Sequence, residues 1–162
     1  MKQKGGYFPL FVNLNSKKII IIGGGKIALR RLETLLSFSC QLIVIAPILS
    51  DKIVDYHAKG MIEVINREFL DCDIEDAYMV IAATNQANVN DHIHEICKEN
   101  NILINHAGNK EKCDFYFPGI IKKEEMVIGV TASGKDHRLA KDLTDRIKGL
   151  VEMLTEGSEM KE

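Results

Sequence analysis

Three consecutive glycines follow an apolar run near the start of the chain, in the segment IIIIGGGKIALRR. The segment fits G-x-G-x-x-A, with Gly23, Gly25 and Ala28 at the defining positions. In this motif the first glycine permits a tight turn, the second lets the backbone approach a pyrophosphate, and the small third residue keeps a helix close to the sheet. Helix N-terminal N–H groups attract anions, so we predict a dinucleotide site; the alternative is a turn that only helps packing. The predicted cofactor-binding residues of this turn are Gly23, Gly24, Gly25, Lys26, Ile27 and Ala28.

A second polar segment, AATNQANVN, follows a later apolar run. Open α/β sheets bind ligands at the carboxyl ends of their strands, which makes Thr84 and Asn85 candidate cofactor contacts. Helix capping by Asn85 or Asn88 is the alternative. An acid that binds ribose is expected about 20 residues after the glycines, where this chain has residues 45–47 (IAP). Asp51 lies past the proline and is expected to begin a helix, so this position does not choose between NAD and NADP.

The elements that position these residues alternate between short apolar runs and helical patterns. Strands are expected at residues 18–22, 41–47, 61–65, 77–84 and 102–106, and helices at about 26–38, 51–59 and 88–99. This alternation predicts an α/β fold, a Rossmann-like parallel sheet with right-handed crossovers. We assign residues 1–117 to this NAD-binding, Rossmann-like domain.

The pattern changes after Pro118, where GIIKKEEMVIGVTAS predicts an antiparallel hairpin and residues 137–154 predict one amphipathic helix. Leu139, Leu143, Ile147 and Leu150 share a face of that helix. A hairpin and one helix bury too little surface alone, so residues 118–162 are expected to be a small dimerisation region that packs on a second copy of the chain.

The composition limits the class of protein. With 162 residues, 46% hydrophobic and 27% charged, the chain is long enough for one main core. A net charge of −2 lacks the basic face typical of nucleic-acid binding, which favours a small-molecule partner. No apolar run reaches the ~18 residues of a membrane span, and we expect a cytoplasmic protein. Cys40, Cys72, Cys97 and Cys113 form no CxxC pair and are expected to be reduced, mostly buried thiols.

Several segments together resemble the precorrin-2 dehydrogenase domain of siroheme synthases. They are YFPLFVNLNSKKIIIIGGGKIALRRLETLL, LIVIAP, IAATN, the IN before a polar loop, DFYFPGII, VIGVTASG and LAKDL, and they occur in the family's order from about Tyr7 to Leu150. The resemblance implies oxidation of precorrin-2, an anionic tetrapyrrole, to sirohydrochlorin with NAD as cofactor. It also implies a homodimer whose second domain crosses between subunits.

The resemblance bears on the polar loop in LINHAGNKEKCDFYFPG. From its residues alone, this loop is either the edge of an active site or a simple turn. The family usually has an aspartate, a general base or metal-site acid, three residues beyond the asparagine that corresponds to Asn105. Here that position is Gly108. His106 and Asp114 are the candidate catalytic proton acceptors, against the alternatives of a solvated histidine and a turn-capping aspartate. Asn105 is a candidate substrate contact.

A second departure lies in TASGKDHRLA, where family members often have a serine-rich glycine turn followed by Ser-Pro. Ser133 and Lys135 remain candidate tetrapyrrole contacts. Lys135, Arg138 and Lys141 could bind carboxylates of the substrate by charge-assisted hydrogen bonds. The alternative is that these charges only form the solvated face of the last helix.

We expect an NAD-dependent precorrin-2 dehydrogenase, with two rivals. One adds ferrochelatase activity, for which His106, His137 and Asp114 offer nitrogen and oxygen ligands but no recognisable spacing, so no metal site is predicted. The other is a nucleotide- or tetrapyrrole-binding protein that has lost catalysis, which the glycine at position 108 favours.

Overall fold

The computed structural model describes residues 8–132 and 136–156. The chain divides into two compact units. One is Pro9–Phe115, and the other contains Phe8 and the described residues from Tyr116 onward. Each unit is described by itself.

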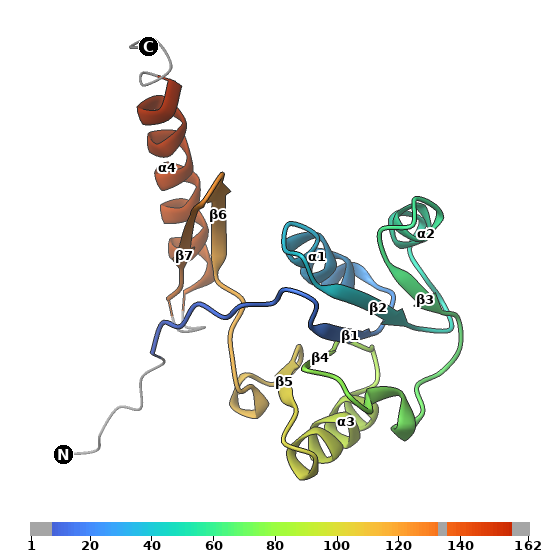
Figure 1. Ribbon diagram of the computed structural model, residues 1–162. Helices are drawn as coiled ribbons and strands as arrows, with labels where there is room; N and C mark the ends of the chain where they lie inside the picture. The colour runs from blue at the N-terminus through green and yellow to red at the C-terminus, as the bar shows by residue number, and fades with distance from the viewer. Residues whose placement is uncertain (1–7, 133–135, 157–162) are drawn as a thin grey trace, which may run out of the picture. The chain divides into compact units, whose positions relative to one another are not determined.

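The first unit is built on a five-stranded parallel sheet with strand order β3-β2-β1-β4-β5 (Figure 1). Its strands are β1 (Lys18–Ile22), β2 (Gln41–Ile45), β3 (Glu63–Ile65), β4 (Met79–Ala82) and β5 (Leu103–His106). Its helices are α1 (Lys26–Leu35), α2 (Asp51–Ala58) and α3 (Ala87–Glu99), with two short 3₁₀ helices, η1 (Asp71–Ile74) and η2 (Lys110–Lys112). The strand order reverses at β1, which pairs with both β2 and β4 and so marks the switch point where such sheets bind ligands.

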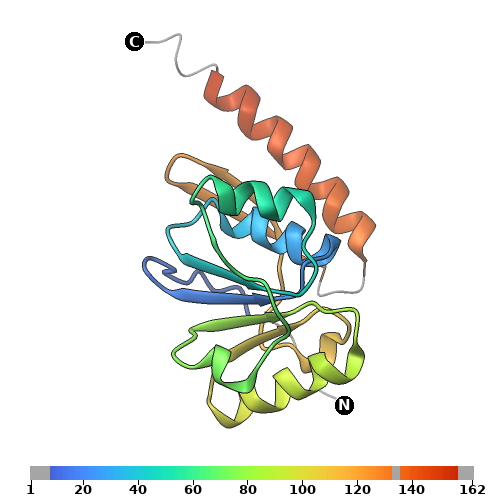
Figure 2. The same ribbon diagram turned by 90° about the vertical axis from the view of Figure 1, so that its right-hand side faces the viewer.

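Both faces of this sheet are covered, with α1 and α2 on one face and α3 on the other (Figure 2). The central strand β1 therefore consists of isoleucines that are fully buried from Ile19 to Ile22, and β4 is buried along its whole length. Each such side chain contributes roughly 1.5–3 kcal/mol relative to an exposed one. Helix α1 buries Ala28, Leu32 and Leu35, at helical spacing. The predicted α/β fold with a Rossmann-like sheet is confirmed.

β1 has the predicted bounds, and the other four strands of the parallel sheet are shorter than the apolar runs predicted. The expected strand at 61–65 begins at Glu63, and the one at 77–84 covers only Met79–Ala82. The unpredicted helix η1 explains part of the polar segment between them. Asp73 accepts two hydrogen bonds from Arg67, at 2.7 and 2.6 Å, and one from the Leu70 N–H at 2.8 Å. The Arg67 guanidinium lowers the pKa of Asp73, so this bend is held by an ionised carboxylate.

The second unit contains the predicted hairpin and helix. β6 (Gly119–Lys123) and β7 (Met126–Val130) are antiparallel, and Glu124 adopts a φ of 51° in the turn between them. Helix α4 (His137–Glu156) begins at Asp136, whose Oδ1 accepts the N–H groups of Arg138 at 3.0 Å and Leu139 at 2.9 Å. This is an N-cap of the usual kind.

The hairpin and α4 approach each other closely at Gly119, where a Cβ would collide with the Thr144 side chain. A second face of α4 is apolar and exposed, since Leu139, Leu143 and Leu150 are 40% to 54% exposed. The unit therefore leaves an apolar helix face without cover from its own described residues. No helix in the described ranges combines the length and apolar character needed to cross a membrane.

All four cysteines are free thiols. Cys97, on α3, is buried in the core, Cys40 and Cys113 are half-buried, and Cys72 is exposed. The expectation of mostly buried thiols is therefore wrong for Cys72, which belongs to the surface helix η1. Burial raises the pKa of Cys97 to about 12.

Candidate functional site

The first two glycines of the turn after β1 are packed against backbone. Gly23 has a φ of +124°, and a Cβ there would collide with the carbonyl oxygen of Ala83 at the end of β4. A Cβ on Gly24 would collide with the carbonyl oxygen of Ile48, and the Gly24 carbonyl accepts the N–H of Ser50 at 3.0 Å. These two positions exclude side chains because three loops meet at the switch point.

Gly25 is different, because a Cβ there would have no neighbour within 4 Å. It is the N-cap residue of α1, with no side-chain cap and no acidic residue in the first turn. The N–H groups of that turn are therefore available to an anion, as a bound pyrophosphate requires. Lys26 and Ile27 are exposed beside them, and Ala28 is buried against the sheet. This end of α1 fits a dinucleotide.

The loop after β2 carries no carboxylate at the expected ribose position. Asn66 donates hydrogen bonds to the carbonyl oxygens of Ala46 at 2.9 Å and Pro47 at 3.2 Å, which fixes the loop. Asp51 is the first residue of α2, as predicted, with Ser50 as the N-cap residue.

A cavity of about 330 Å³ lies at the carboxyl ends of β4 and β5, next to the glycine turn. It is lined by Thr84, Asn85, Ala87, Asn90, Asp91, His106, Gly108 and Asn109. All of them belong to the first unit. The structure thus brings together three predicted site residues, Thr84 and Asn85 from the loop after β4 and His106 from the end of β5.

Thr84 and Asn90 form one wall of the cavity through a closed set of hydrogen bonds. The Thr84 hydroxyl donates to Asn90 Oδ1 at 2.8 Å, the Thr84 N–H donates to the same oxygen at 3.0 Å, and Asn90 Nδ2 donates to the Thr84 carbonyl at 3.1 Å. Helix α3 starts after Gln86 without a side-chain cap, so neither Asn85 nor Asn88 caps it. Asn85 is exposed at the cavity edge.

His106 is 5% exposed, and both of its ring nitrogens have partners. Nε2 lies 3.1 Å from Asp91 Oδ1, and Nδ1 accepts the N–H of Gly108 at 3.2 Å. A nitrogen that accepts an N–H carries no proton, so the proton of the neutral ring is on Nε2 and is donated to Asp91. The role of His106 as a general base stays a prediction, and these contacts favour a role in orienting Asp91.

Asp91, on α3, was not among the predicted site residues. Its Oδ1 accepts Lys112 Nζ at 2.7 Å in addition to His106. Lys112 and, less strongly, His106 hold the pKa of Asp91 below its usual range. The signal in the sequence was the spacing of Ala87, Asn90 and Asp91, three positions on one helix face directly after a strand end.

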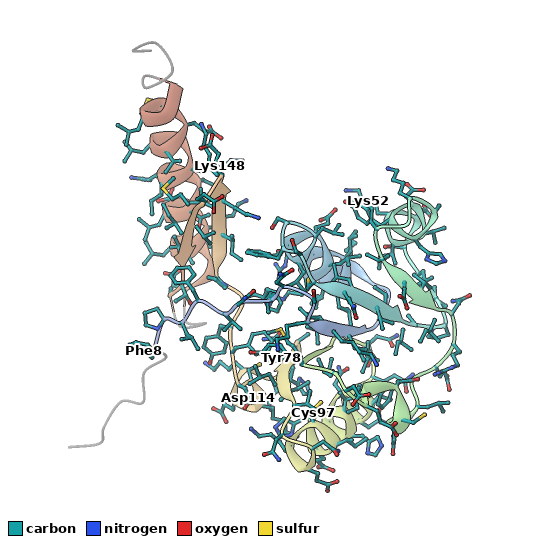
Figure 3. The ribbon with its side chains drawn as sticks, in the orientation of Figure 1. Phe8, Lys52, Tyr78, Cys97, Asp114 and Lys148 are labelled. Carbon is teal, nitrogen blue, oxygen red and sulfur yellow. The ribbon has the colours of Figure 1, made fainter. Side chains whose placement is uncertain are left out.

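Asp114 lies at the β5 edge of the sheet and does not line the cavity (Figure 3). Its Oδ2 accepts the N–H of Ile104 at 3.1 Å, its own N–H donates to the Ile104 carbonyl at 2.9 Å, and its Oδ1 accepts Lys98 Nζ at 2.6 Å. Both carboxylate oxygens are thus engaged, Oδ2 with the backbone of β5 and Oδ1 with Lys98 of α3. Asn105 is also outside the cavity lining: it is 3% exposed and donates to the Phe115 carbonyl at 2.9 Å.

The loop between His106 and Cys113 is held by the Cys113 thiol. Its sulfur accepts the His106 N–H at 3.2 Å and lies 3.3 Å from the His106 carbonyl oxygen, and burial raises its pKa. Gly108 does not use a positive φ, and a Cβ there would make ordinary contacts with the His106 ring at 3.5 and 3.7 Å. The loop therefore has room for a side chain at position 108.

Of the predicted substrate contacts in the second unit, Arg138 is exposed in the first turn of α4. Ser133 and Lys135 lie outside the described residues. Among the described residues, no three His, Cys, Asp or Glu side chains are grouped so as to hold a metal ion.

A family profile described as "Putative NAD(P)-binding" matches residues 10–119. A "Probable multifunctional siroheme biosynthesis protein HemA" from Ruminiclostridium josui is 35% identical over 144 residues, which cover 88% of this chain and 28% of that protein. A "Siroheme synthase" from Nitrosococcus oceani is 29% identical over 90% of this chain and 31% of its own length. The chain thus spans about three tenths of the length of these relatives.

A solved structure of "SirC, precorrin-2 dehydrogenase" has the same fold, with a TM-score of 0.73 and 22% identity over 88% of this chain and 70% of that one. The profile matches well over half of the chain and includes the glycine turn and every residue of the cavity lining. The sequence motifs and these matches agree, and the chain belongs to the precorrin-2 dehydrogenase and siroheme synthase N-terminal domain family of NAD(P)-binding proteins.

Proposed function

We propose that this chain oxidises precorrin-2 to sirohydrochlorin with NAD as the hydride acceptor. The observation that carries the proposal is the pairing of two features at one edge of the sheet. An uncapped helix start faces open space at Gly25, and a polar cavity lies beside it. Relatives named for siroheme biosynthesis support the choice of substrate.

The reaction removes a hydride and a proton from the reduced macrocycle, and bound NAD supplies the hydride-accepting ring. The chain's part is to bind and orient two large ligands. The backbone at Gly25, Lys26 and Ile27 binds the pyrophosphate, while Gly23, Gly24 and Ala28 hold the turn in place. Thr84 and Asn85, which line the cavity, contact the bound cofactor there.

The substrate's carboxylates are assigned to Ser133, Lys135 and Arg138, because a hydroxyl donor and two cationic donors suit an anionic tetrapyrrole. Asn105 has a buried Oδ1 that finds no hydrogen-bond partner in the described part of the chain, and its amide N–H donates to the Phe115 carbonyl. We assign Asn105 to holding the end of the β5 loop and not to direct contact in the cavity.

The test is an assay of the purified chain with precorrin-2 and NAD⁺, with NADH formation and the tetrapyrrole spectrum recorded together. We expect both to change in equal molar amounts. Replacement of NAD⁺ by NADP⁺ in the same assay measures the preference for the cofactor. Binding of both ligands without NADH would contradict the proposed oxidation.

One observation favours a second candidate, a binding protein without catalysis. Gly108 supplies no carboxylate to the cavity from the position where the family usually has one. In that case the chain would saturate with NAD and tetrapyrrole and give no turnover in the same assay.

We further propose a homodimer formed through the second unit. The exposed apolar face of α4, with Leu139, Leu143 and Leu150, supports it, because isolated apolar faces of this kind usually mark contact sites. Sedimentation should give about twice the chain mass. Leu143→Glu should give the monomer, whereas Lys148→Glu, a change at an exposed lysine of the same helix (Figure 3), should leave the dimer intact.

A further inference from the structure

The cavity beside the glycine turn contains one carboxylate, and it comes from α3. Asp91 is the acidic residue among the eight that line the cavity. The loop after β5, on the other side, contributes Gly108, which has no side chain, and His106, whose ring is buried. Asp114 has both oxygens bound at the edge of the sheet. If a carboxylate acts in this cavity, the structure offers Asp91.

We infer that Asp91 is a catalytic residue, the carboxylate that stabilises positive charge on the substrate and then accepts its proton. The inference rests on the proposed function. It places this group on α3 and not on the loop after β5.

The contacts of Asp91 leave one oxygen for this task. Lys112 Nζ at 2.7 Å and His106 Nε2 at 3.1 Å both bind Oδ1. Oδ2 has no hydrogen-bond partner among the described residues, and the side chain is 45% exposed at the cavity. Two donors on one oxygen fix the orientation of the carboxylate and leave the other oxygen to a ligand. His106 and Lys112 are therefore positioning residues in this arrangement.

The electrostatics suit a carboxylate that must be charged before the reaction begins. Lys112 and His106 favour its ionised form, so Asp91 is an anion at neutral pH. The substrate loses one C–H hydrogen with both bonding electrons to the nicotinamide ring, which reduces NAD⁺ to NADH and leaves the macrocycle with a positive charge. A cation of this kind is a strong acid, so even a weakly basic carboxylate can take its proton. Proton transfer to Oδ2 then removes the positive charge from the macrocycle and gives the product, and Asp91 returns the proton to water.

The experiment compares two Asp→Asn variants in the full chain. Asp91→Asn keeps the size of the side chain and removes its charge. The matched control is Asp71→Asn, because Asp71 also pairs with a histidine, His92 Nε2 at 2.9 Å, but on the exposed surface and outside the cavity lining. Three quantities are measured: turnover with precorrin-2 and NAD⁺, calorimetric affinity for NAD⁺ alone, and the ¹⁵N shifts of the His106 ring.

We expect Asp91→Asn to lower turnover by ~10²–10⁴-fold, the usual range for a general base, with NAD⁺ affinity within about threefold of wild type. Asp71→Asn should change neither. An asparagine amide still offers the His106 Nε2–H an acceptor oxygen, so the ¹⁵N shifts should report the same Nε2–H tautomer as in the wild type. Unchanged shifts would show that the loss of turnover does not come from displacement of the His106 ring.

An active wild type with an equally active Asp91→Asn variant would overturn the inference and leave the proposed function standing. A wild type that binds both ligands and forms no NADH would overturn both. Should Asp91→Asn fail to fold, Asp91→Glu takes its place, because it keeps the charge and the fold but moves the carboxylate by one methylene. Full loss of turnover in Asp91→Glu, with intact binding of both ligands, would support the inference that the position of this carboxylate matters for the reaction. Unchanged turnover in Asp91→Glu would count against the inference.

Discussion

The glycine turn and the cavity next to it are built by opposite means. The turn is made of backbone: Gly23 and Gly24 touch carbonyl groups of other loops, and Gly25 leaves open space above an uncapped helix. The cavity is made of side chains, with Asp91 from α3 and His106 from β5 joined by a hydrogen bond. At Gly23 and Gly24 this kind of site depends on the absence of a side chain, so only glycine fits these two positions.

In a site made of side chains, more than one position can supply the same functional group. The carboxylate of a cavity can come from any element that borders it, and here α3 provides one where the loop after β5 has Gly108. The comparison teaches that a missing functional residue at one position does not establish a missing function. Mutations in the two regions should therefore have different consequences, beginning with the largest.

Gly25→Asp should abolish NAD binding while the fold survives. A carboxylate ~4 Å from a pyrophosphate charge costs about 4 kcal/mol at an effective dielectric constant of 20, or ~10³-fold in affinity. Aspartate is a favourable N-cap residue, so α1 should remain. The control is Gly25→Asn, whose side chain has the same size as aspartate but no charge, and which should lose much less NAD affinity. Calorimetry measures the NAD affinity of both variants. Equal affinities of the two variants would show that this turn does not bind the dinucleotide.

Gly23→Ala should destabilise the fold, in contrast to Gly25→Ala. At Gly23, the φ of +124° and the collision with the Ala83 carbonyl oxygen make an alanine costly, by ~2–3 kcal/mol. At Gly25 the methyl group enters open space, with an expected cost below about 1 kcal/mol. Denaturant unfolding compares the two. Similar stabilities would show that the turn is less constrained than its contacts indicate.

His106→Ala should lower turnover by ~10–100-fold, the usual effect of losing a group that orients a reactive one. The conservative variant His106→Gln offers an amide N–H to Asp91 and cannot act as a base. We expect it to recover most of the activity. A His106→Gln variant as impaired as an Asp91→Asn variant would instead support His106 itself as the general base.

Gly108→Asp should have the smallest effect in the wild-type background, a change in turnover below about tenfold, because two groups with one task are not additive. Its Cβ makes ordinary contacts only, so the variant should fold. In an Asp91→Asn background the same change should restore part of the lost turnover. Thermal unfolding of both variants comes first, and a double variant without recovery would mean that position 108 does not face the reacting atoms.

The sequence alone determined the strands, most of the helices and the glycine turn, because each is a local property. Buried parallel strands need unbroken apolar runs, as in KIIII of β1, and a tight turn with an open helix start needs glycine at fixed spacing. The same local rule placed Asp51 at the start of α2. Where pairing partners decide the length, as for β3 and β4, the apolar runs predicted strands that were too long.

Only the tertiary structure decided which polar residues form the cavity. Strand order places β4 beside β5 and α3 over their shared face, and this brings Asp91 within 3.1 Å of a histidine 15 positions away in sequence. The same geometry takes Asp114 to the edge of β5, where its carboxylate binds Ile104 and Lys98. Side-chain direction depends on pairing register and helix packing, and both are set by contacts between distant segments. Local patterns in the sequence therefore predicted the loops of the site but not which carboxylate faces into it.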